Sequence, residues 1–121
     1  MRHTFPAQRR LRLKSDFERV QGGGQRIADS YFSMTFRPND LGAPRLGLAV
    51  AIRTVGTAVA RNRVRRIVKE SFRLAQHALP AVDIVVAARA RVKGAVSRDL
   101  RASLATLWNK VASRCASSSA V

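Results

Sequence analysis

The sequence has 121 residues, of which 23 are lysine or arginine and seven are acidic, so its formal charge at pH 7 is +16. The length fits a single domain, and the apolar fraction of 46% is ordinary for a folded protein. A charge this large implies a polyanionic partner. Nucleic acid comes first, because cations that neutralise phosphates release condensed counterions, followed by an anionic membrane surface or an acidic protein.

Several protein classes are excluded by what the sequence lacks. The single cysteine, Cys115, excludes a disulfide framework and favours a reducing compartment, and nothing resembles a metal-ligand spacing. No run approaches the roughly 18 apolar residues of a membrane span, and the basic N-terminus has no apolar signal region. We therefore expect a cytoplasmic protein without a membrane partner.

Residues 1–14 are predicted to form a basic N-terminal extension, after which the first helix begins. Ser15 is a suitable N-cap, and Glu18 completes a capping box, which satisfies two backbone N–H groups that would otherwise lack partners. The glycines at 22–24 predict that this helix is short and ends in a flexible turn, because glycine loses more backbone entropy on folding than any other residue.

Two segments then alternate in hydrophobicity with the period of two that is typical of a strand with one buried face. In residues 31–36 the predicted core residues are Phe32, Met34 and Phe36. In residues 45–52 the large residues of one face are Leu46, Leu48, Val50 and Ile52. The other face of this second strand carries only glycine and alanine, which leaves room for a close approach to the backbone.

A helix is predicted over residues 58–78, ending before Pro80, and residues 83–89 form a strand that is apolar on both faces. Such a strand is typical of a central position beside a parallel neighbour, and the interval of about thirty residues is long enough for a crossover connection. The last helix begins near Ser97 and repeats apolar residues at helical spacing.

These elements predict one α/β domain at residues 15–112, a two-layer α+β sandwich. Its order is helix, two or three strands, helix, strand, helix. Residues 113–121 are small and polar, with no means of packing, and are predicted to form a flexible tail.

The helix over 58–78 carries its charges as a ridge opposite its apolar face. At about 100° per residue, the outward arc holds Arg65, Arg66, Lys69 and Arg73. Arg61 and Arg63 lie on the margins of the apolar face, with Asn62 between them. A solvated surface is the ordinary interpretation, but like charges four residues apart cost about 0.2–0.5 kcal/mol per pair, and Glu70 is the only acid in the helix. We therefore favour anion binding, since arginine can contact a phosphate through two N–H groups.

Residues 45–74, RLGLAVAIRTVGTAVARNRVRRIVKESFRL, resemble the core signature of the bacterial ribonuclease P protein subunit. The similarity combines a strand, a Gly-x-Ala-Val turn at 56–59, an Arg-Asn-Arg motif at 61–63 and a Ser-Phe-Arg helix end. The stretches SDFERV, PRLGL and DIVVAAR agree with the family on either side, so the resemblance covers residues 11–111.

The resemblance implies a mixed four-stranded sheet whose parallel strands are joined by a left-handed crossover, against the general preference for right-handed ones. It also implies a protein that assists a catalytic RNA in removing the 5′ leader from precursor tRNA. The RNA would use Mg²⁺, while the protein alone would bind no cofactor and no small-molecule substrate. The residues that would face the RNA subunit are Arg61, Asn62, Arg63, Arg65, Arg66 and Lys69.

The family contacts the 5′ leader in a cleft between the first helix and the sheet. The candidates for this contact are Phe17, Tyr31, Thr35 and Arg53. Phe17 would stack on a base, although it is also suited to the core. Gln21 stands where the family often has a second aromatic residue, and Ile52 where it often has a lysine, so leader binding would depend more on Arg53 and the backbone.

We predict no catalytic residue in the protein itself. Its acidic residues are scattered singly, without a pair spaced for a two-metal site. His3 and His77 occur in unrelated segments, and Cys115 lies in the predicted tail without a base. The alternatives are a structural RNA-binding protein of ribosomal or RNA-chaperone type and a membrane-surface protein, which the alanine- and valine-rich apolar face disfavours.

Overall fold

The computed structural model describes residues 14–49 and 55–119. Its elements in chain order are α1 (Lys14–Gly23), β1 (Gln25–Ala28), β2 (Phe32–Pro38), β3 (Arg45–Ala49), α3 (Ala58–Ala75), η2 (Gln76–Ala78), β4 (Val82–Ala88), η3 (Ala90–Val92) and α4 (Ser97–Ser119). The strands form a four-stranded sheet in the order β1-β2-β4-β3, in which β3 and β4 are parallel and the other neighbours antiparallel. This confirms the predicted mixed sheet of an α+β domain.

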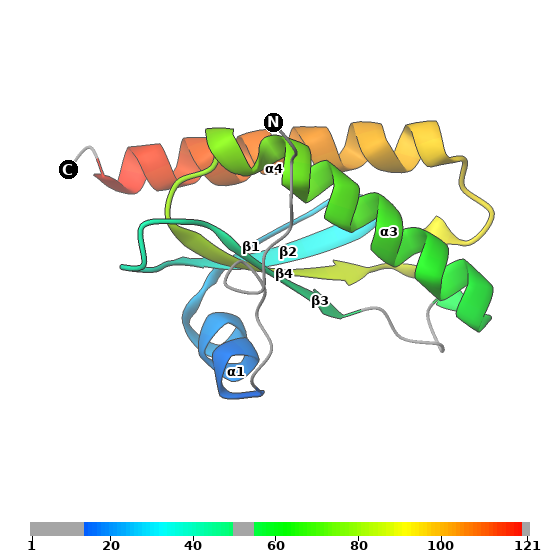
Figure 1. Cartoon of the computed structure of the whole chain (residues 1–121), viewed down its shortest axis with the longest axis horizontal. Coiled ribbons are helices and arrows are strands. Elements are labelled where there is room, and N and C mark those ends of the chain that lie inside the picture. Colours follow the sequence, from blue (N-terminus) through cyan, green and yellow to red (C-terminus); the bar gives the residue numbers. More distant parts are fainter. Residues whose placement is uncertain (1–13, 50–54, 120–121) are drawn as a thin grey trace.

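Helices lie on both sides of the sheet (Figure 1). α3 and α4 pack on each other and cover one face, which is the predicted sandwich, while the short α1 lies against the opposite face. The predicted central strand is β4, which is buried between β2 and its parallel neighbour β3. The handedness of the β3–α3–β4 crossover stays a prediction, and Val50 and Ile52 lie outside the described residues.

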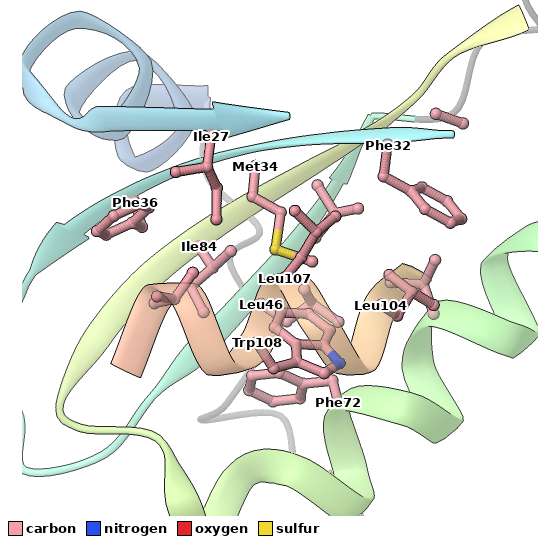
Figure 2. Close-up of a cluster of buried hydrophobic side chains, with 14 of the residues drawn as sticks. Ile27, Phe32, Met34, Phe36, Leu46, Phe72, Ile84, Leu104, Leu107 and Trp108 are labelled. Atoms are coloured by element: carbon pink, nitrogen blue, oxygen red, sulfur yellow. The ribbon is translucent and has the colours of Figure 1, made fainter. Parts of the chain in front are cut away.

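The main core fills the space between the sheet and the two long helices. The predicted alternation in β2 is confirmed, since the side chains of Phe32, Met34 and Phe36 are fully buried. Figure 2 shows Met34 extending from β2 towards α4, where Leu107 and Trp108 meet Phe72 of α3. The rings of Phe72 and Trp108 are in edge contact, with centroids 5.7 Å apart. The apolar faces of both helices are therefore buried inside the domain.

The flexible turn predicted for the glycines at 22–24 is wrong. α1 continues through Gly22 and Gly23, and β1, which sequence reasoning did not locate, begins at Gln25. A Cβ atom on Gly24 would lie 2.5 Å from the carbonyl oxygen of Val20 and 2.6 Å from that of Phe36. The glycine thus allows the end of the helix to approach β2 closely, and this packing outweighs the low helix propensity of its neighbours.

The flexible tail predicted for residues 113–121 is also wrong in its first part. α4 continues to Ser119, and Cys115 is buried in the main core one turn beyond Val111. Cysteine behaves here as a small apolar residue that extends the buried face of the helix. Burial raises the pKa of its thiol, which disfavours the reactive thiolate.

Candidate nucleic-acid interface

The start of α3 fixes the direction in which its charged face points. Gly56 has a φ of 102°, a conformation that side chains with a Cβ avoid, and it turns the chain into the helix. Thr57 is the N-cap, and its hydroxyl oxygen accepts a hydrogen bond of 3.2 Å from the backbone N–H of Ala60. The buried residues of the helix are Val64, Ile67, Val68 and Phe72, so the opposite face is directed to solvent.

Five polar or basic residues of the predicted ridge line a shallow hollow on this outer face. They are Asn62, Arg65, Arg66, Lys69 and Arg73, and Glu70 completes the lining. Arg66 and Lys69 are exposed, and Arg65 is half-buried. Nη2 of Arg101 in α4 lies 3.4 Å from the carboxylate of Glu70. The one acid of α3 therefore forms a salt bridge with an arginine outside the helix. We name this surface, formed by Asn62, Arg65, Arg66, Lys69 and Arg73, the α3 ridge.

The two marginal arginines have different surroundings. Arg63 is half-buried, and its Nη2 donates to the carbonyl oxygen of Ala95 at 2.7 Å and to the hydroxyl of Ser97 at 3.2 Å. These bonds tie α3 to the beginning of α4, so Arg63 has a structural role that sequence reasoning missed. Arg61 makes no such bond: its Nε is buried and lacks a hydrogen-bond partner within the described part of the chain. Of the two, Arg61 is the one whose guanidinium makes no hydrogen bond within the described residues.

The face of the sheet beside α1 is built from small residues. The strand register places Ser33, Ala87 and Ala49 in one row across β2, β4 and β3. The next row holds Thr35, Val85 and Gly47, and Val85 packs against Val20 of α1. The predicted small-residue face of β3 is therefore confirmed at Gly47 and Ala49, and it continues onto the neighbouring strands.

Asp83 holds one end of this face together. Its carboxylate accepts two hydrogen bonds from Arg45, at 2.8 and 2.7 Å, one from Asn39 at 2.8 Å and one from Arg19 of α1 at 2.8 Å. Burial raises the pKa of Asp83, but the hydrogen bonds from Arg45 and Asn39 and the charges of both arginines outweigh it, so the pKa lies below its usual range. The bond to Arg19 fastens α1 to the sheet.

Sequence reasoning treated Asp83 only as the start of an apolar strand. A signal was available, since a lone carboxylate in a strand that is otherwise buried needs cationic partners. The sequence offers many arginines, however, and nothing in it says which ones the fold brings to this position.

The structure separates the predicted leader-contacting residues. Thr35 lies on the α1 face, half-buried beside Val85. Tyr31 instead precedes β2, packs against the main core and lines a hollow with Ser103 and other residues of α4, so it does not share the α1 face. Phe17 belongs to α1, but its side chain and the whole of Arg53 lie outside what the structure describes.

The described residues offer no metal centre. Within 14–49 and 55–119, no three histidine, cysteine, aspartate or glutamate side chains are grouped closely enough to hold an ion. The same part of the chain contains no helix that is both long and apolar enough to cross a membrane. The chemistry that the arrangement supports is binding of anions along α3 and of an extended chain over the small residues beside α1.

Comparison with known proteins decides the family. The family model described as Ribonuclease P matches residues 5–112. The chain belongs to the ribonuclease P protein family. The ribonuclease P protein component of Aliivibrio fischeri is 39% identical over 111 residues, covering 92% of this chain and 95% of that protein. The component of Escherichia coli O157:H7 is 42% identical over 107 residues, covering 88% and 90%.

Solved structures agree with this assignment. The RNase P protein of Staphylococcus aureus is 30% identical, has a TM-score of 0.79 and is matched over 86% of this chain and 94% of that one. The RNase P protein of Thermotoga maritima is 33% identical, with a TM-score of 0.76 and coverage of 84% and 96%. Membership of the family implies a role in tRNA processing together with a partner RNA subunit.

Proposed function

We propose that the chain is the protein subunit of a cytoplasmic ribonuclease P, and that it binds the catalytic RNA through the α3 ridge together with Arg61. The observation that carries the proposal is the ridge itself. Its cations are held on a helix whose other face is fully packed, and the only acid of that helix is engaged with Arg101. Such a surface matches the spaced negative charges of an RNA backbone.

The electrostatic cost of the ridge supports binding over a purely structural role. Arg65 and Lys69, and Lys69 and Arg73, are like charges four residues apart, which weakens an isolated helix. Phosphates placed between them would convert this repulsion into attraction. Asn62, which is exposed beside the cations, would add a donor and an acceptor able to contact a base edge or a 2′-hydroxyl.

The 5′ leader of precursor tRNA would lie on the α1 face. Ala49, which is exposed, and Ala87, which is half-buried, would let a nucleotide chain approach the sheet, with Thr35 half-buried in the next row. Phe17 and Arg53, whose side chains lie outside the description, complete the proposed contact. Tyr31 would stabilise the domain and would not contact the leader, because it packs against the main core.

Cleavage itself would be performed by the RNA subunit with its own Mg²⁺. Two of the acidic side chains are engaged in contacts within the protein. Asp83 binds Arg45 and Arg19, and Asp29 binds Ser103. A carboxylate used in this way is not free to hold a metal ion or activate water. The protein would bind the catalytic RNA and raise the affinity of the assembled enzyme for precursor tRNA.

The test is cleavage of a 5′-extended precursor tRNA by a bacterial ribonuclease P RNA at low Mg²⁺, with and without this protein. We expect the protein to restore cleavage at the mature 5′ end, and Arg66→Gln/Lys69→Gln to lose roughly tenfold in RNA affinity. The matched control, Arg91→Gln/Lys93→Gln, removes the same charge outside α3. RNA binding without restored cleavage would instead assign the chain to structural RNA-binding proteins.

A further inference from the structure

A second basic groove lies at the edge of the sheet, between β1 and the C-terminal half of α4. Arg26 stands on the β1 side, and Asn109, Lys110, Ser113 and Arg114 stand on the α4 side, above the apolar floor of Ile27. We name it the β1–α4 groove. It shares no residue with the α3 ridge, and β1 is the opposite edge of the sheet from β3.

The charges of the groove come from two independent elements. Lys110 and Arg114 are one helical turn apart on α4, so their side chains project from the same side of the helix. Arg26 faces them from β1, and all three are exposed. The groove therefore gathers three cations from two elements that are distant in sequence, and none of the described residues in its lining is acidic.

These cations are not neutralised by the protein. In the described ranges, none of the three side chains makes a hydrogen bond or a salt bridge. Asp29 interacts electrostatically with Lys110, but its carboxylate accepts hydrogen bonds from the Ser103 hydroxyl and from the backbone N–H groups of Tyr31 and Phe32. Asp29 is thus committed to the connection between β1 and β2.

We propose that the β1–α4 groove binds an RNA phosphodiester backbone as a contact surface separate from the α3 ridge and the α1 face. Guanidinium groups on facing walls can each contact a phosphate through two N–H groups, while Lys110, Asn109 and Ser113 supply further donors. None of the described residues that line the groove is aromatic, so they offer bases no ring to stack on and favour contact with the backbone. The inference rests on the proposed function.

RNA is favoured over a protein strand as the occupant. β1 is an edge strand, and an edge can accept a peptide by strand addition. It has only four residues, however, and short edges with a basic side chain are poor templates for strand pairing. Three unneutralised cations with two neutral donors match a chain of phosphates better.

The test compares Arg26→Gln/Lys110→Gln/Arg114→Gln with Arg91→Gln/Lys93→Gln/Arg98→Gln, which removes the same charge elsewhere. Binding of a bacterial ribonuclease P RNA is measured across a salt series. We expect the groove variant to bind roughly tenfold more weakly than the control and to lower the slope of log affinity against log salt by about 2 to 3. Arg26→Lys/Arg114→Lys, which keeps the charge, should keep the slope.

Two arms distinguish the sources of phosphate. In the first the titrant is the catalytic RNA alone, and in the second it is precursor tRNA added to the assembled holoenzyme. A defect confined to one arm assigns the groove to that RNA. The inference would be overturned if the groove variant and the control had equal effects in both arms. It would also be overturned if the groove variant kept its RNA affinity and lost only the ability to bind polyglutamate, because the groove would then bind an acidic polypeptide.

The α3 variant Arg66→Gln/Lys69→Gln is measured in parallel. If it weakens RNA binding while the groove variant equals its control, the further inference fails and the proposed function stands. If neither the α3 variant nor the groove variant affects binding and the wild-type protein restores no cleavage, the proposed function fails as well. Thermal unfolding of each variant verifies that the fold is retained.

Discussion

The two faces of the sheet are stabilised in different ways. On the face covered by α3 and α4, large side chains such as Phe32, Phe36 and Phe72 are fully buried in one continuous core. On the α1 face the buried apolar residues among the described side chains are Val20 and Val85, which pack together beside small residues and a charged network. The difference indicates that large apolar side chains stabilise one face, whereas small side chains and a charged network form the other.

The position of α1 therefore depends on polar contacts to an unusual degree. Asp83 binds Arg19 of α1, and Arg37 of β2 donates to the carbonyl oxygen of Arg19 at 3.4 Å. Hydrogen bonds and ion pairs need defined geometry, whereas apolar contacts tolerate sliding. A helix held in this way keeps a fixed position on the sheet, which suits the proposed contact with an extended nucleotide chain.

The largest expected effect comes from breaking the core face. Phe72→Ala removes a fully buried ring in edge contact with Trp108, and we expect it to lower the free energy of unfolding by about 3 to 5 kcal/mol. Val85→Ala on the α1 face should cost only about 1 to 2 kcal/mol, because two methyl groups lose burial. Urea unfolding measures both, and equal losses would contradict the difference between the faces.

Asp83→Asn tests the charged network of the α1 face. We expect a loss of about 1.5 to 3 kcal/mol, the range for hydrogen bonds to charged groups, because the salt bridge between Arg45 and Asp83 is lost. Because the pKa of Asp83 is lowered in the folded state, its carboxylate stabilises the protein above the unfolded value near 3.8, and this contribution is lost as the pH falls further.

Unfolding between pH 5 and pH 2 would separate this contribution from the others. The wild-type protein should lose stability as acid is added, and Asp83→Asn should lose less over the same range. A residual slope is expected from Asp29: burial raises its pKa, but the hydrogen bonds from Ser103, Phe32 and Tyr31 and the charge of Lys110 bring it below its usual range. An identical loss of stability between pH 5 and pH 2 in the two proteins would refute the role given to Asp83.

The glycines at the end of α1 give a matched pair of smaller effects. Gly24→Ala should destabilise the protein by about 1 to 3 kcal/mol, because the added Cβ would collide with the backbone of Val20 and Phe36. Gly22→Ala meets no atom within 4 Å and lies in the helix, so it should stabilise by about 0.4 to 1 kcal/mol. Thermal unfolding of both variants measures the difference, and the same sign for both would show that the close approach is not tight.

The smallest effect on stability is expected on the α3 ridge. Arg66→Gln/Lys69→Gln should change the free energy of unfolding by less than about 0.5 kcal/mol, since both side chains are exposed and face solvent. Arg63→Ala should cost about 1 kcal/mol through the lost bonds to Ala95 and Ser97. Chemical unfolding checks both, and an equal loss would mean that the ridge is itself a packing element.

Periodicity predicted most of the elements correctly. The alternation around Met34 located β2 and its buried face, and Pro80 marked the end of the segment that contains α3. Propensity failed at Gly22 and Gly23, where the helix continues because its end packs against β2. It failed again at Cys115, since small residues in sequence do not reveal that a core lies beneath them.

The candidate site was predicted unevenly for the same reason. The charged arc of α3 follows from helical spacing alone, so Arg65, Arg66 and Lys69 lie on the outer face as expected. The sequence did not predict that Tyr31 and Thr35 lie on different faces of the sheet. Tyr31 precedes β2, so the alternation of that strand does not extend to it. The partners of Arg63 are more than thirty residues away along the chain, beyond the reach of any local pattern.

Local patterns in the sequence were enough to predict the period of most elements and the charged face of one helix. Those properties depend on neighbours within one or two turns, which the sequence shows directly. Only the tertiary structure decided that Asp83 collects Arg19 and Arg45, and that Arg26 faces Lys110 across a groove. Electrostatic partners are chosen by distance in space, and in a chain with 23 basic residues local sequence does not specify which of them meet.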